Sequence, residues 1–454
     1  MRIVIVGAGE VGFHIAKRFA SEGKDVVVVD TNAEALKHVG EQLDVLTVHG
    51  SGSSPKMLVE AGIAKAHMLL AVTNSDDTNL IACFFANVLA PGARKIVRIK
   101  SEEYADHAYA LAKDLLGVNL VINPDVEVVE SILRLLAAPA AVEINEFADG
   151  LIWMAGVRLP QDSPLVGRTL TELPTVTGEL RVMVATLVRD EKLIIPTGAD
   201  RFQSGDHVYF ACEKSDLDAV LARFGFHHPP IRNILIVGGG KIGLHLAMIL
   251  ESRGKNVKLV ERDPDRCREL ATILDKTVVL AGDGTNHELL EEENIQAMDM
   301  VIALTGDEET NIISCLLAKR LGARKTLTRI NKFAYMPLVK AIGIDQTVSP
   351  RLSAINSILR QVRRGKIISA VSIKDEEVEI IEAVALEDSE LVGRPLKNLT
   401  VRKFALILTV IRAGKVIIPS GETVILPMDR ILILAASKDV PRVERVLAVK
   451  VERD

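Results

Sequence analysis

The chain has 454 residues, of which 48% are hydrophobic, 25% are charged and only 4% are aromatic. This composition excludes a disordered chain, and the low aromatic content argues against stacking platforms for single-stranded nucleic acid. With 55 basic and 60 acidic residues the formal net charge is −5, so the protein has no overall basic field that would attract nucleic acid or anionic lipid.

The N-terminal part of the chain alternates short aliphatic runs with amphipathic stretches. Near-continuous apolar strands joined by helices are typical of a parallel sheet covered on both faces. Helices are predicted over stretches such as Val11–Ser21 and Asp76–Leu89. Six strands are predicted, over Ile3–Val6, Val26–Val29, Val45–Val48, Leu69–Val72, Ile96–Ile99 and Leu120–Ile122.

A glycine-rich turn follows the first predicted strand and opens the first helix. It consists of Gly7, Ala8, Gly9, Glu10, Val11 and Gly12, and Asp30 ends the next strand. The first glycine allows a tight turn, the second lets the backbone approach a pyrophosphate, and the third lets helix and strand pack closely. The helix N-terminus offers amide donors to the phosphates, and the acid accepts from ribose hydroxyls while repelling a 2′-phosphate. The pattern predicts a site for NAD(H) or an adenine nucleotide rather than NADP(H).

Further contacts are expected at the carboxyl ends of the later strands. Thr73 and Asn74 follow the fourth strand, where they face the ribose or adenine. Arg98 ends the fifth strand, where it binds phosphate or, as the alternative, forms a salt bridge with a carboxylate. The acids Asp76 and Asp77 open a helix, and we expect them to stabilise its dipole rather than to bind a cation.

Beyond the sheet, the apolar runs 181–188, 193–196 and 207–211 end in turn residues and predict a compact β-rich α+β lobe. The whole arrangement then repeats. Residues 3–30 match 234–261, the AVTNSDDTN segment from Ala71 matches ALTGDEETN from Ala303, and SILR occurs at both 131–134 and 357–360. The second site accordingly comprises Gly238, Gly239, Gly240, Lys241, Ile242, Gly243, Glu261, Thr305 and Arg329.

The predicted fold is therefore α/β, with two tandem Rossmann-like parallel-sheet domains, each followed by a small α+β lobe. The expected domains are 1–140, 141–226, 231–366 and 367–454, and the paired prolines near 226–230 hold an extended connector between the halves.

A dehydrogenase would also need a proton-transfer group and a substrate-orienting residue beside the nicotinamide. The small lobes carry no repeated His, Lys or Tyr constellation, so we expect a non-enzymatic sensor with no catalytic residues and no metal site. The four cysteines, without a Cys-x-x-Cys spacing, are expected to be buried, reduced thiols. No signal peptide opens the chain, and its longest uncharged stretch, 78–93, is too short to span a bilayer, so we expect a cytoplasmic protein.

The chain resembles the regulator-of-potassium-conductance family over essentially its whole length. The resemblance rests on the duplicated glycine motif, on the paired VTNSDDTN and LTGDEETN segments, on RIKSEEY from Arg98 matched by RINKFAY from Arg329, and on the repeated LVGR and IIPxG motifs. It implies a gating subunit that binds NAD(H), with ATP or ADP as further ligands, at the site residues named above. It also implies a homo-oligomer, a dimer or tetramer forming a ring beneath a membrane potassium channel subunit such as TrkH or TrkG on the inner face of the membrane.

One departure from the family pattern concerns Ser51, which stands where many members, and Asp283 in the second half, have an acid. A ligand contact from that position is therefore not expected in the first site. Two alternatives remain at this point: an NAD-dependent oxidoreductase, and a nucleotide-responsive regulator of a different membrane transport protein.

Overall fold

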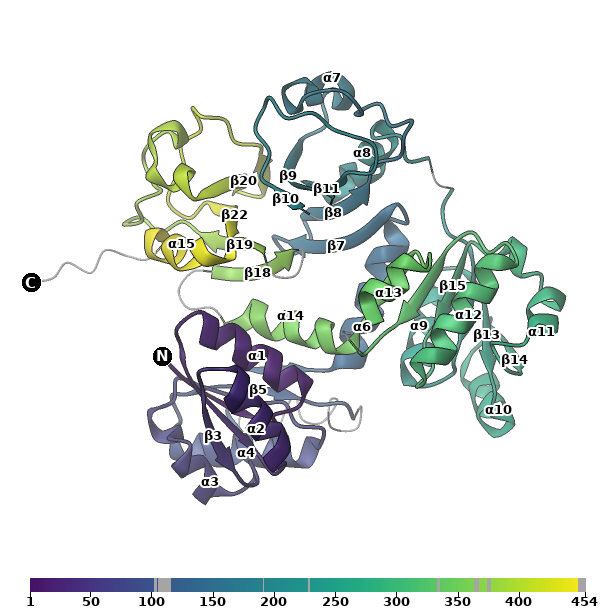
Figure 1. Cartoon of the computed structure of the whole chain (residues 1–454), viewed down its shortest axis with the longest axis horizontal. Helices are drawn as coiled ribbons and strands as arrows, with labels where there is room; N and C mark the ends of the chain where they lie inside the picture. The colour runs from purple at the N-terminus through teal and green to yellow at the C-terminus, as the bar shows by residue number, and fades with distance from the viewer. Residues whose placement is uncertain are drawn as a thin grey trace, which may run out of the picture. The chain divides into compact units, whose positions relative to one another are not determined.

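The computed structural model describes residues 1–101, 104, 116–190, 192–227, 229–332, 335–362, 367–373 and 377–447. Positions 102, 103, 333 and 334 of the two RIxxxxY motifs lie outside these described residues. The chain divides into two compact units (Figure 1), each of which combines segments from both halves of the sequence. Unit 1 contains residues 1–132 and 231–358, and unit 2 contains residues 133–230 and 359–454.

Unit 1 contains two six-stranded, all-parallel sheets. The first has the strand order β3-β2-β1-β4-β5-β6, in which the first strand lies at the centre and the order reverses beside it. Its strands are β1 (Arg2–Val6), β2 (Asp25–Asp30), β3 (Leu46–His49), β4 (Met68–Ala71), β5 (Arg94–Arg98) and β6 (Leu120–Ile122). Its helices are α1 (Glu10–Ser21), α2 (Ala33–Gln42), α3 (Pro55–Glu60), α4 (Asp76–Leu89) and α6 (Pro124–Ala137).

The second sheet repeats this topology in the order β14-β13-β12-β15-β16-β17. Its strands are β12 (Asn233–Val237), β13 (Asn256–Glu261), β14 (Val278–Ala281), β15 (Met300–Ala303), β16 (Thr326–Arg329) and β17 (Gln346–Val348). Its helices are α9 (Lys241–Ser252), α10 (Pro264–Ile273), α11 (His287–Glu292), α12 (Glu308–Arg320), α13 (Met336–Ala341) and α14 (Pro350–Val362). Because all strands of a parallel sheet have their carboxyl ends at the same edge, the loops that follow the strands lie at the same edge as the glycine turn in each sheet.

The central strands are buried on both faces, as the apolar runs predict. In β1 the side chains of Val4 and Val6 pack into a cluster with Ala82 and Cys83 of α4, and Ile3 and Ile5 are also fully buried. Helix starts are fixed locally, since the Ser75 side chain caps α4 and the equivalent Asp307 caps α12.

Unit 2 contains two five-stranded antiparallel sheets, with the orders β10-β9-β11-β8-β7 and β18-β19-β22-β20-β21. A shared apolar cluster that includes Phe147, Met154, Val371 and Leu432 joins the two small lobes. The first lobe comprises β7 (Ala141–Phe147), β8 (Ile152–Arg158), α7 (Leu173–Thr177), β9 (Val182–Arg189), β10 (Lys192–Ile194), β11 (His207–Glu213) and α8 (Leu217–Arg223). The second comprises β18 (Ile367–Ile373), β19 (Val378–Val384), β20 (Ala405–Arg412), β21 (Lys415–Ile417), β22 (Arg430–Ala436) and α15 (Val440–Leu447).

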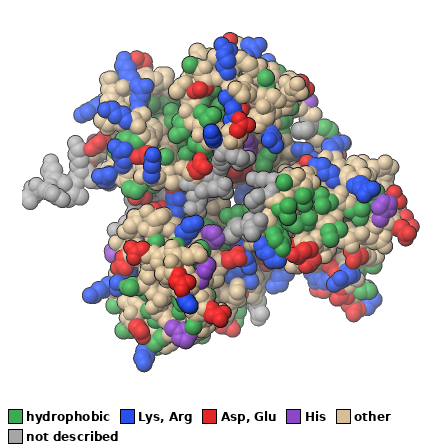
Figure 2. Space-filling model, in the orientation of Figure 1, with side chains coloured by type: hydrophobic (Ala, Val, Ile, Leu, Met, Phe, Trp, Pro, Cys, Tyr) green, Lys and Arg blue, Asp and Glu red, His purple; other side chains and the backbone are tan. Residues whose placement is uncertain are grey.

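The predicted fold class, two Rossmann-like domains each with a small α+β lobe, is thereby confirmed. The compact units divide within α6 and α14, at residues 132/133 and 358/359, whereas the sequence analysis placed domain ends at 140 and 366. None of the helices in the described part of the chain is long and apolar enough to cross a bilayer. Basic and acidic side chains are interspersed on the face shown in Figure 2, in keeping with the net charge of −5.

Candidate functional site

Both glycine turns have the backbone geometry that their sequence predicts. Gly7 and Gly238 have φ angles of +114° and +107°, which side-chain-bearing residues rarely adopt. Gly12 lies so close to the turn that a Cβ atom there would be 1.8 Å from the Gly7 carbonyl oxygen. In contrast, a Cβ added at Gly9 or Gly240 would meet nothing within 4 Å, so the second glycine of each turn faces open space at the helix N-terminus. This open space is what a closely approaching phosphate group would require.

The acids that end the second strand of each sheet hold the glycine turns. In the first site, Asp30 Oδ2 accepts a hydrogen bond from the Ala8 amide at 2.6 Å, and its Oδ1 accepts one from the Asn32 amide at 2.7 Å. In the second site, Glu261 Oε2 accepts from the Gly239 amide at 2.8 Å. A carboxylate has about four lone-pair sites, so these bonds leave capacity for a ribose hydroxyl. The role of Asp30 and Glu261 toward ribose stays a prediction.

A buried asparagine in each lobe, Asn79 or Asn311, forms hydrogen bonds with the residues that follow the fourth strand. The sequence analysis did not identify either asparagine. Asn79 Oδ1 accepts from the Thr73 amide at 2.9 Å and from the Thr73 hydroxyl at 2.7 Å, while Nδ2 donates to the carbonyls of Thr73 and Arg98. Asn311 makes the same contacts with Thr305 and Arg329. The signal was the Thr-Asn ending shared by VTNSDDTN and LTGDEETN. The hydroxyls of Thr73 and Thr305 therefore donate hydrogen bonds within their own lobes, and their contact with a ligand stays a prediction.

Of the arginines that end the fifth strands, Arg98 is buried and Arg329 is half-buried, and both are only partly satisfied. Arg98 is 8% exposed, and its Nη1 donates to the Thr73 carbonyl at 3.1 Å and to Asn74 Oδ1 at 3.0 Å. The Nε atoms of Arg98 and Arg329 are buried and have no hydrogen-bond partner. Among the described residues neither guanidinium forms an ion pair, so the salt-bridge alternative is not observed there.

Burial lowers the pKa of Arg98 below its ordinary value, although Asp76 and Asp125 oppose the shift. Burial likewise lowers the pKa of Arg329, and Asp125 again opposes it. A guanidinium stays protonated in proteins, so both side chains are desolvated cations. A desolvated cation with a free N–H group gains strongly from an anion that reaches it.

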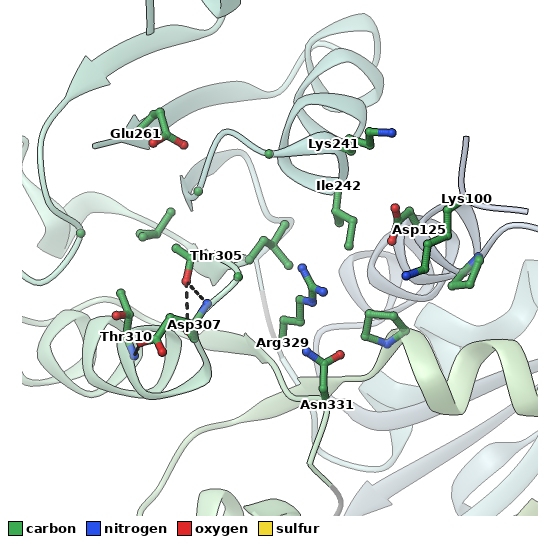
Figure 3. A pocket seen from close by; sticks show the side chains of 18 of the residues that line it. Lys100, Asp125, Lys241, Ile242, Glu261, Thr305, Asp307, Thr310, Arg329 and Asn331 are labelled. Atoms are coloured by element: carbon green, nitrogen blue, oxygen red, sulfur yellow. Dashed lines mark hydrogen bonds between the residues drawn. The ribbon is translucent and has the colours of Figure 1, made fainter. Parts of the chain in front are cut away.

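A cavity of about 730 Å³ within unit 1 joins these features (Figure 3). The view shows Arg329 extending toward Ile242 of the second glycine motif, with Asp125 and Lys100 of the first lobe on the other side of Ile242. This volume is within the usual range for a small-ligand pocket. Of the predicted site residues, the lining includes Val11, Asn74, Arg98, Gly238, Gly240, Lys241, Ile242, Glu261, Thr305 and Arg329.

The remaining predicted residues do not line this cavity, which is centred on the second glycine turn but does not include every residue of that turn. They are Gly7, Ala8, Gly9, Glu10, Gly12, Asp30, Thr73, Gly239 and Gly243. The lining also includes charged residues that sequence reasoning did not assign to the site, among them Lys100, Asp125 and Arg351. No local pattern marks Lys100 and Asp125, because these two residues of the first lobe approach the second turn only through the packing of one lobe against the other.

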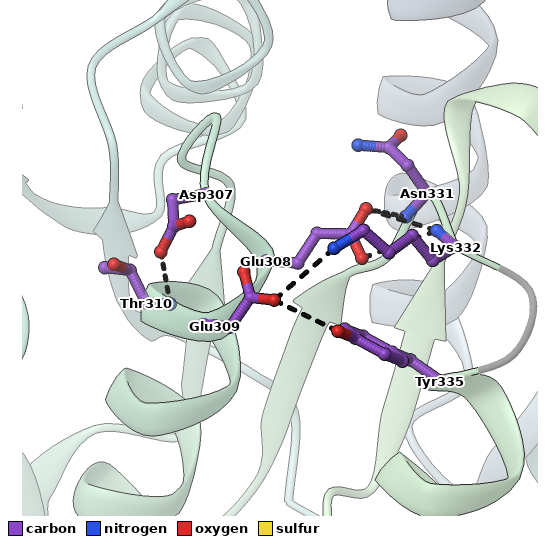
Figure 4. A network of polar contacts seen from close by, with 7 residues as sticks. All are labelled: Asp307, Glu308, Glu309, Thr310, Asn331, Lys332 and Tyr335. Atoms are coloured by element: carbon purple, nitrogen blue, oxygen red, sulfur yellow. Dashed lines mark hydrogen bonds and ion pairs between the residues drawn. The ribbon is translucent and has the colours of Figure 1, made fainter.

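Acids at the start of α4 and α12, namely Asp76, Glu308 and Glu309, accept hydrogen bonds from the segment that follows the fifth strand of each sheet. Figure 4 shows Glu308 accepting from the amides of Asn331 and Lys332, at 2.8 and 3.1 Å, and Glu309 accepting from the Tyr335 hydroxyl at 3.2 Å. Asp76 does the same in the first lobe, with the amides of Lys100 and Ser101. These acids also lie in the first turns of α4 and α12, so the expected role toward the helix dipole stays a prediction beside the observed contacts. In the described part of the chain, no cluster of three or more metal-binding side chains is present.

The two sites differ at the position where the sequence analysis noted a departure. Ser51 Oγ lies 2.7 Å from Ser53 Oγ and makes a local turn. Asp283 accepts from the amide and hydroxyl of Thr285, and these bonds lower the pKa of its carboxyl. Only Asp283 lines the cavity. An acid is thus presented at this position in the second site alone.

Comparison with known proteins places this geometry in a family. The TrkA-N domain model matches residues 3–124 and 234–350, and the TrkA-C domain model matches residues 154–225 and 380–448. The chain is 39% identical to the Trk system potassium uptake protein TrkA of Azorhizobium caulinodans, with 100% of both chains covered. It is 38% identical to the protein of the same name from Halomonas elongata, with 99% of both chains covered.

Solved structures share the fold at lower identity. The crystal structure of the GsuK RCK domain has a TM-score of 0.60 at 20% identity and covers 98% of this chain and 94% of its own. The GsuK channel bound to NAD has a TM-score of 0.61 at 19% identity, covering 98% of this chain and 78% of its own. With two TrkA-N and two TrkA-C matches and full-length relatives above 30% identity, the chain belongs to the family of Trk system potassium uptake proteins TrkA.

Proposed function

We propose that the chain is a nucleotide-sensing regulatory subunit that gates a Trk-type potassium uptake channel. The observation that carries this proposal is the pair of glycine turns with open helix N-termini, one of which faces a cavity containing desolvated arginine side chains. Full-length relatives named for potassium uptake support the physiological setting.

The ligand is NAD(H), with ATP or ADP as competing ligands. Both fit the residues present, since the space beside Gly9 and Gly240 admits a diphosphate and the buried Nε atoms of Arg98 and Arg329 supply donors to an anion. The similar GsuK structure that carries NAD supports the dinucleotide. When bound, the nucleotide supplies negative charge at the junction of the two lobes. The protein's contribution is to hold that charge and to convert it into a shift between lobe arrangements.

We infer a binding role without chemistry at this cavity. Among the described residues that line it, no histidine, cysteine or tyrosine is present. Glu261 is held by backbone amides of its own loop and of the glycine turn, and Asp283 is held by Thr285, which suits positioning more than proton transfer.

The proposed assembly is a homo-oligomeric ring on the cytoplasmic face of the membrane, held there by a TrkH- or TrkG-like channel subunit. Three apolar side chains of α4 support an assembly surface: Ile81, Phe84 and Val88 are 43%, 41% and 63% exposed and follow one face of the helix. The equivalent Ile313 of α12 is 52% exposed. Exposed apolar side chains at helical spacing fit a protein partner better than water.

The decisive experiment measures binding and gating together. Calorimetric titration of the full chain with NADH, ATP and ADP should show saturable binding, and the same ligands should change potassium flux through vesicles that contain the chain and its channel partner. Arg329→Gln should weaken binding roughly ten- to hundred-fold, because it removes a charge-assisted hydrogen-bond donor. Arg320→Gln is the matched control, since Arg320 is exposed on α12 and lies outside the cavity lining.

Lack of saturable binding would refute the sensing role. Binding without any effect on flux would refute the gating role. Turnover of NADH in the presence of a hydroxy or amino acid panel would instead favour an oxidoreductase.

A further inference from the structure

The two parallel-sheet lobes of unit 1 pack around a local two-fold axis. The Ser357 hydroxyl on α14 donates to Glu127 Oε1 on α6 at 2.9 Å, and the Ser131 Oγ on α6 lies 3.4 Å from the Ser353 Oγ on α14. The repeated SILR motif makes Ser131 equivalent to Ser357, and therefore Glu127 equivalent to Ser353. The two contacts thus join the same pair of positions in opposite directions. Such reciprocity defines an isologous interface, here formed within one chain.

The same symmetry relates two pairs of charged residues at the glycine turns. Glu10, the first residue of α1, forms an ion pair with Arg351 at the start of α14. The equivalent positions are Lys241, the first residue of α9, and Asp125 at the start of α6. Lys241 and Asp125 line the same cavity, and Figure 3 shows them on neighbouring elements. The second pair therefore has the charges of the first with their signs exchanged.

This exchange of signs distinguishes correct from incorrect pairing of the lobes. If the first lobe paired with the first lobe of another copy, Glu10 would face Asp125. If the second lobe paired with another second lobe, Lys241 would face Arg351. Both arrangements place like charges together, whereas pairing of a first with a second lobe places opposite charges together at both positions. The equivalent residues Arg98 and Arg329 are arginine in both lobes, so they cannot discriminate between the two pairings.

We propose that Glu10, Asp125, Lys241 and Arg351 form a charge code that directs the first lobe to pair with the second lobe and prevents like lobes of separate copies from pairing. The two lobes share one strand order, so a feature other than topology must distinguish the two pairings wherever several copies meet. Specificity of this kind requires only that the two pairings differ in free energy, and repulsion between like charges in the incorrect pairing supplies that difference. Glu10 and Arg351 side chains are 46% and 37% exposed, so their contribution to overall stability is small.

The test uses the full chain with a cysteine reporter. Ser131→Cys with Ser353→Cys places two thiols at a point where the native hydroxyls are 3.4 Å apart, and mild oxidation should give an intrachain disulfide seen as a faster-moving monomer on a non-reducing gel. The four native cysteines are buried and give little background. A second reporter, Glu127→Cys with Ser131→Cys, gives an interchain dimer only when first lobes of two copies pair.

The double variant Asp125→Arg with Arg351→Asp exchanges the charges at these two positions and leaves the composition and net charge of the chain unchanged. The initial rate of the intrachain disulfide should fall roughly five-fold or more, since the Glu10–Arg351 ion pair becomes a pair of acids and Lys241 then shares the cavity with a second cation at position 125. The second reporter should begin to give dimers. Adding Glu10→Lys and Lys241→Glu restores opposite charges at both positions and should restore the parent rate.

An unchanged rate in the exchanged variant would overturn the proposal, as would a fall that the four-residue variant does not reverse. If the exchanged variant does not fold, the neutral variant Lys241→Gln with Arg351→Gln takes its place. Its rate should lie below that of the parent, and a rate equal to the parent's would also overturn the proposal. Nucleotide binding has no part in these readouts, so the result stands apart from the proposed gating role.

Discussion

Substitution of Gly12 by alanine tests how closely helix and turn must pack. A Cβ atom at this position would lie 1.8 Å from the Gly7 carbonyl oxygen and 2.9 Å from the Gly7 carbonyl carbon. Neither atom belongs to a flexible side chain, so α1 or the turn must move as a backbone unit. Overpacking of this kind costs about 1–3 kcal/mol, and the better helix propensity of alanine returns at most about 1 kcal/mol. We therefore expect the free energy of unfolding to fall by about 1–2 kcal/mol.

The same movement displaces the amides of the first turn of α1 from their positions around the candidate phosphate site. Urea unfolding measures the loss of stability, and NADH fluorescence titration measures the loss of binding at the first site. The matched control is Gly9→Ala, because a Cβ at Gly9 meets nothing within 4 Å and the φ angle of −67° suits alanine. We expect this control to change the free energy of unfolding by less than about 0.5 kcal/mol and still to weaken NADH binding, since the methyl group fills the space meant for phosphate.

The two variants therefore separate packing from ligand approach. Wild-type stability in Gly12→Ala would refute the close-packing argument. Wild-type NADH affinity in Gly9→Ala would refute the assignment of the open space to phosphate.

Two further predictions concern buried side chains of the first lobe. Asn79→Ala should lower the free energy of unfolding by about 2–3 kcal/mol, because the Thr73 amide and the Arg98 carbonyl lose buried partners; urea unfolding that matches the wild type would contradict the role given to Asn79. Burial raises the pKa of the Cys83 thiol from 9.0 to about 12, so the thiol ionises in the unfolded chain at a lower pH than in the folded chain, and stability must fall as the pH rises above 9. Between pH 8 and pH 10 this single thiol should remove roughly 1.4 kcal/mol, and Cys83→Ala should show a correspondingly smaller loss. Equal losses in both proteins would argue against a buried neutral thiol.

The sequence alone was sufficient to predict the fold class and the glycine turns. Six apolar strands alternate with amphipathic helices in each half of the chain, and a glycine motif follows the first strand of each half. Together these features predict a doubly wound parallel sheet. The physical reason is local: only glycine tolerates the φ of Gly7 and the close approach at Gly12, and both requirements are met within a few residues of one strand and one helix.

The partners of the turns were decided by tertiary structure. The ligand contacts that the sequence predicts for Asp30 and Thr73 stay predictions, and only the structure shows that Asp30 accepts from the Ala8 amide and that the Thr73 hydroxyl donates to Asn79. A sequence does not show which backbone amide or side chain will lie within hydrogen-bonding distance of a given carboxylate or hydroxyl group, because the packing of strands and helices decides that.

The contribution of each lobe to the other lobe's site also came only from the structure. Asp125 and Arg351 begin equivalent helices, and no local pattern links them to Lys241 and Glu10, which are more than a hundred residues away. Local propensity and hydrophobic period act over a few helical turns, so they build each lobe by itself. The pairing of charges between lobes depends on a rigid-body fit of two finished surfaces, and that fit exists only in the folded chain.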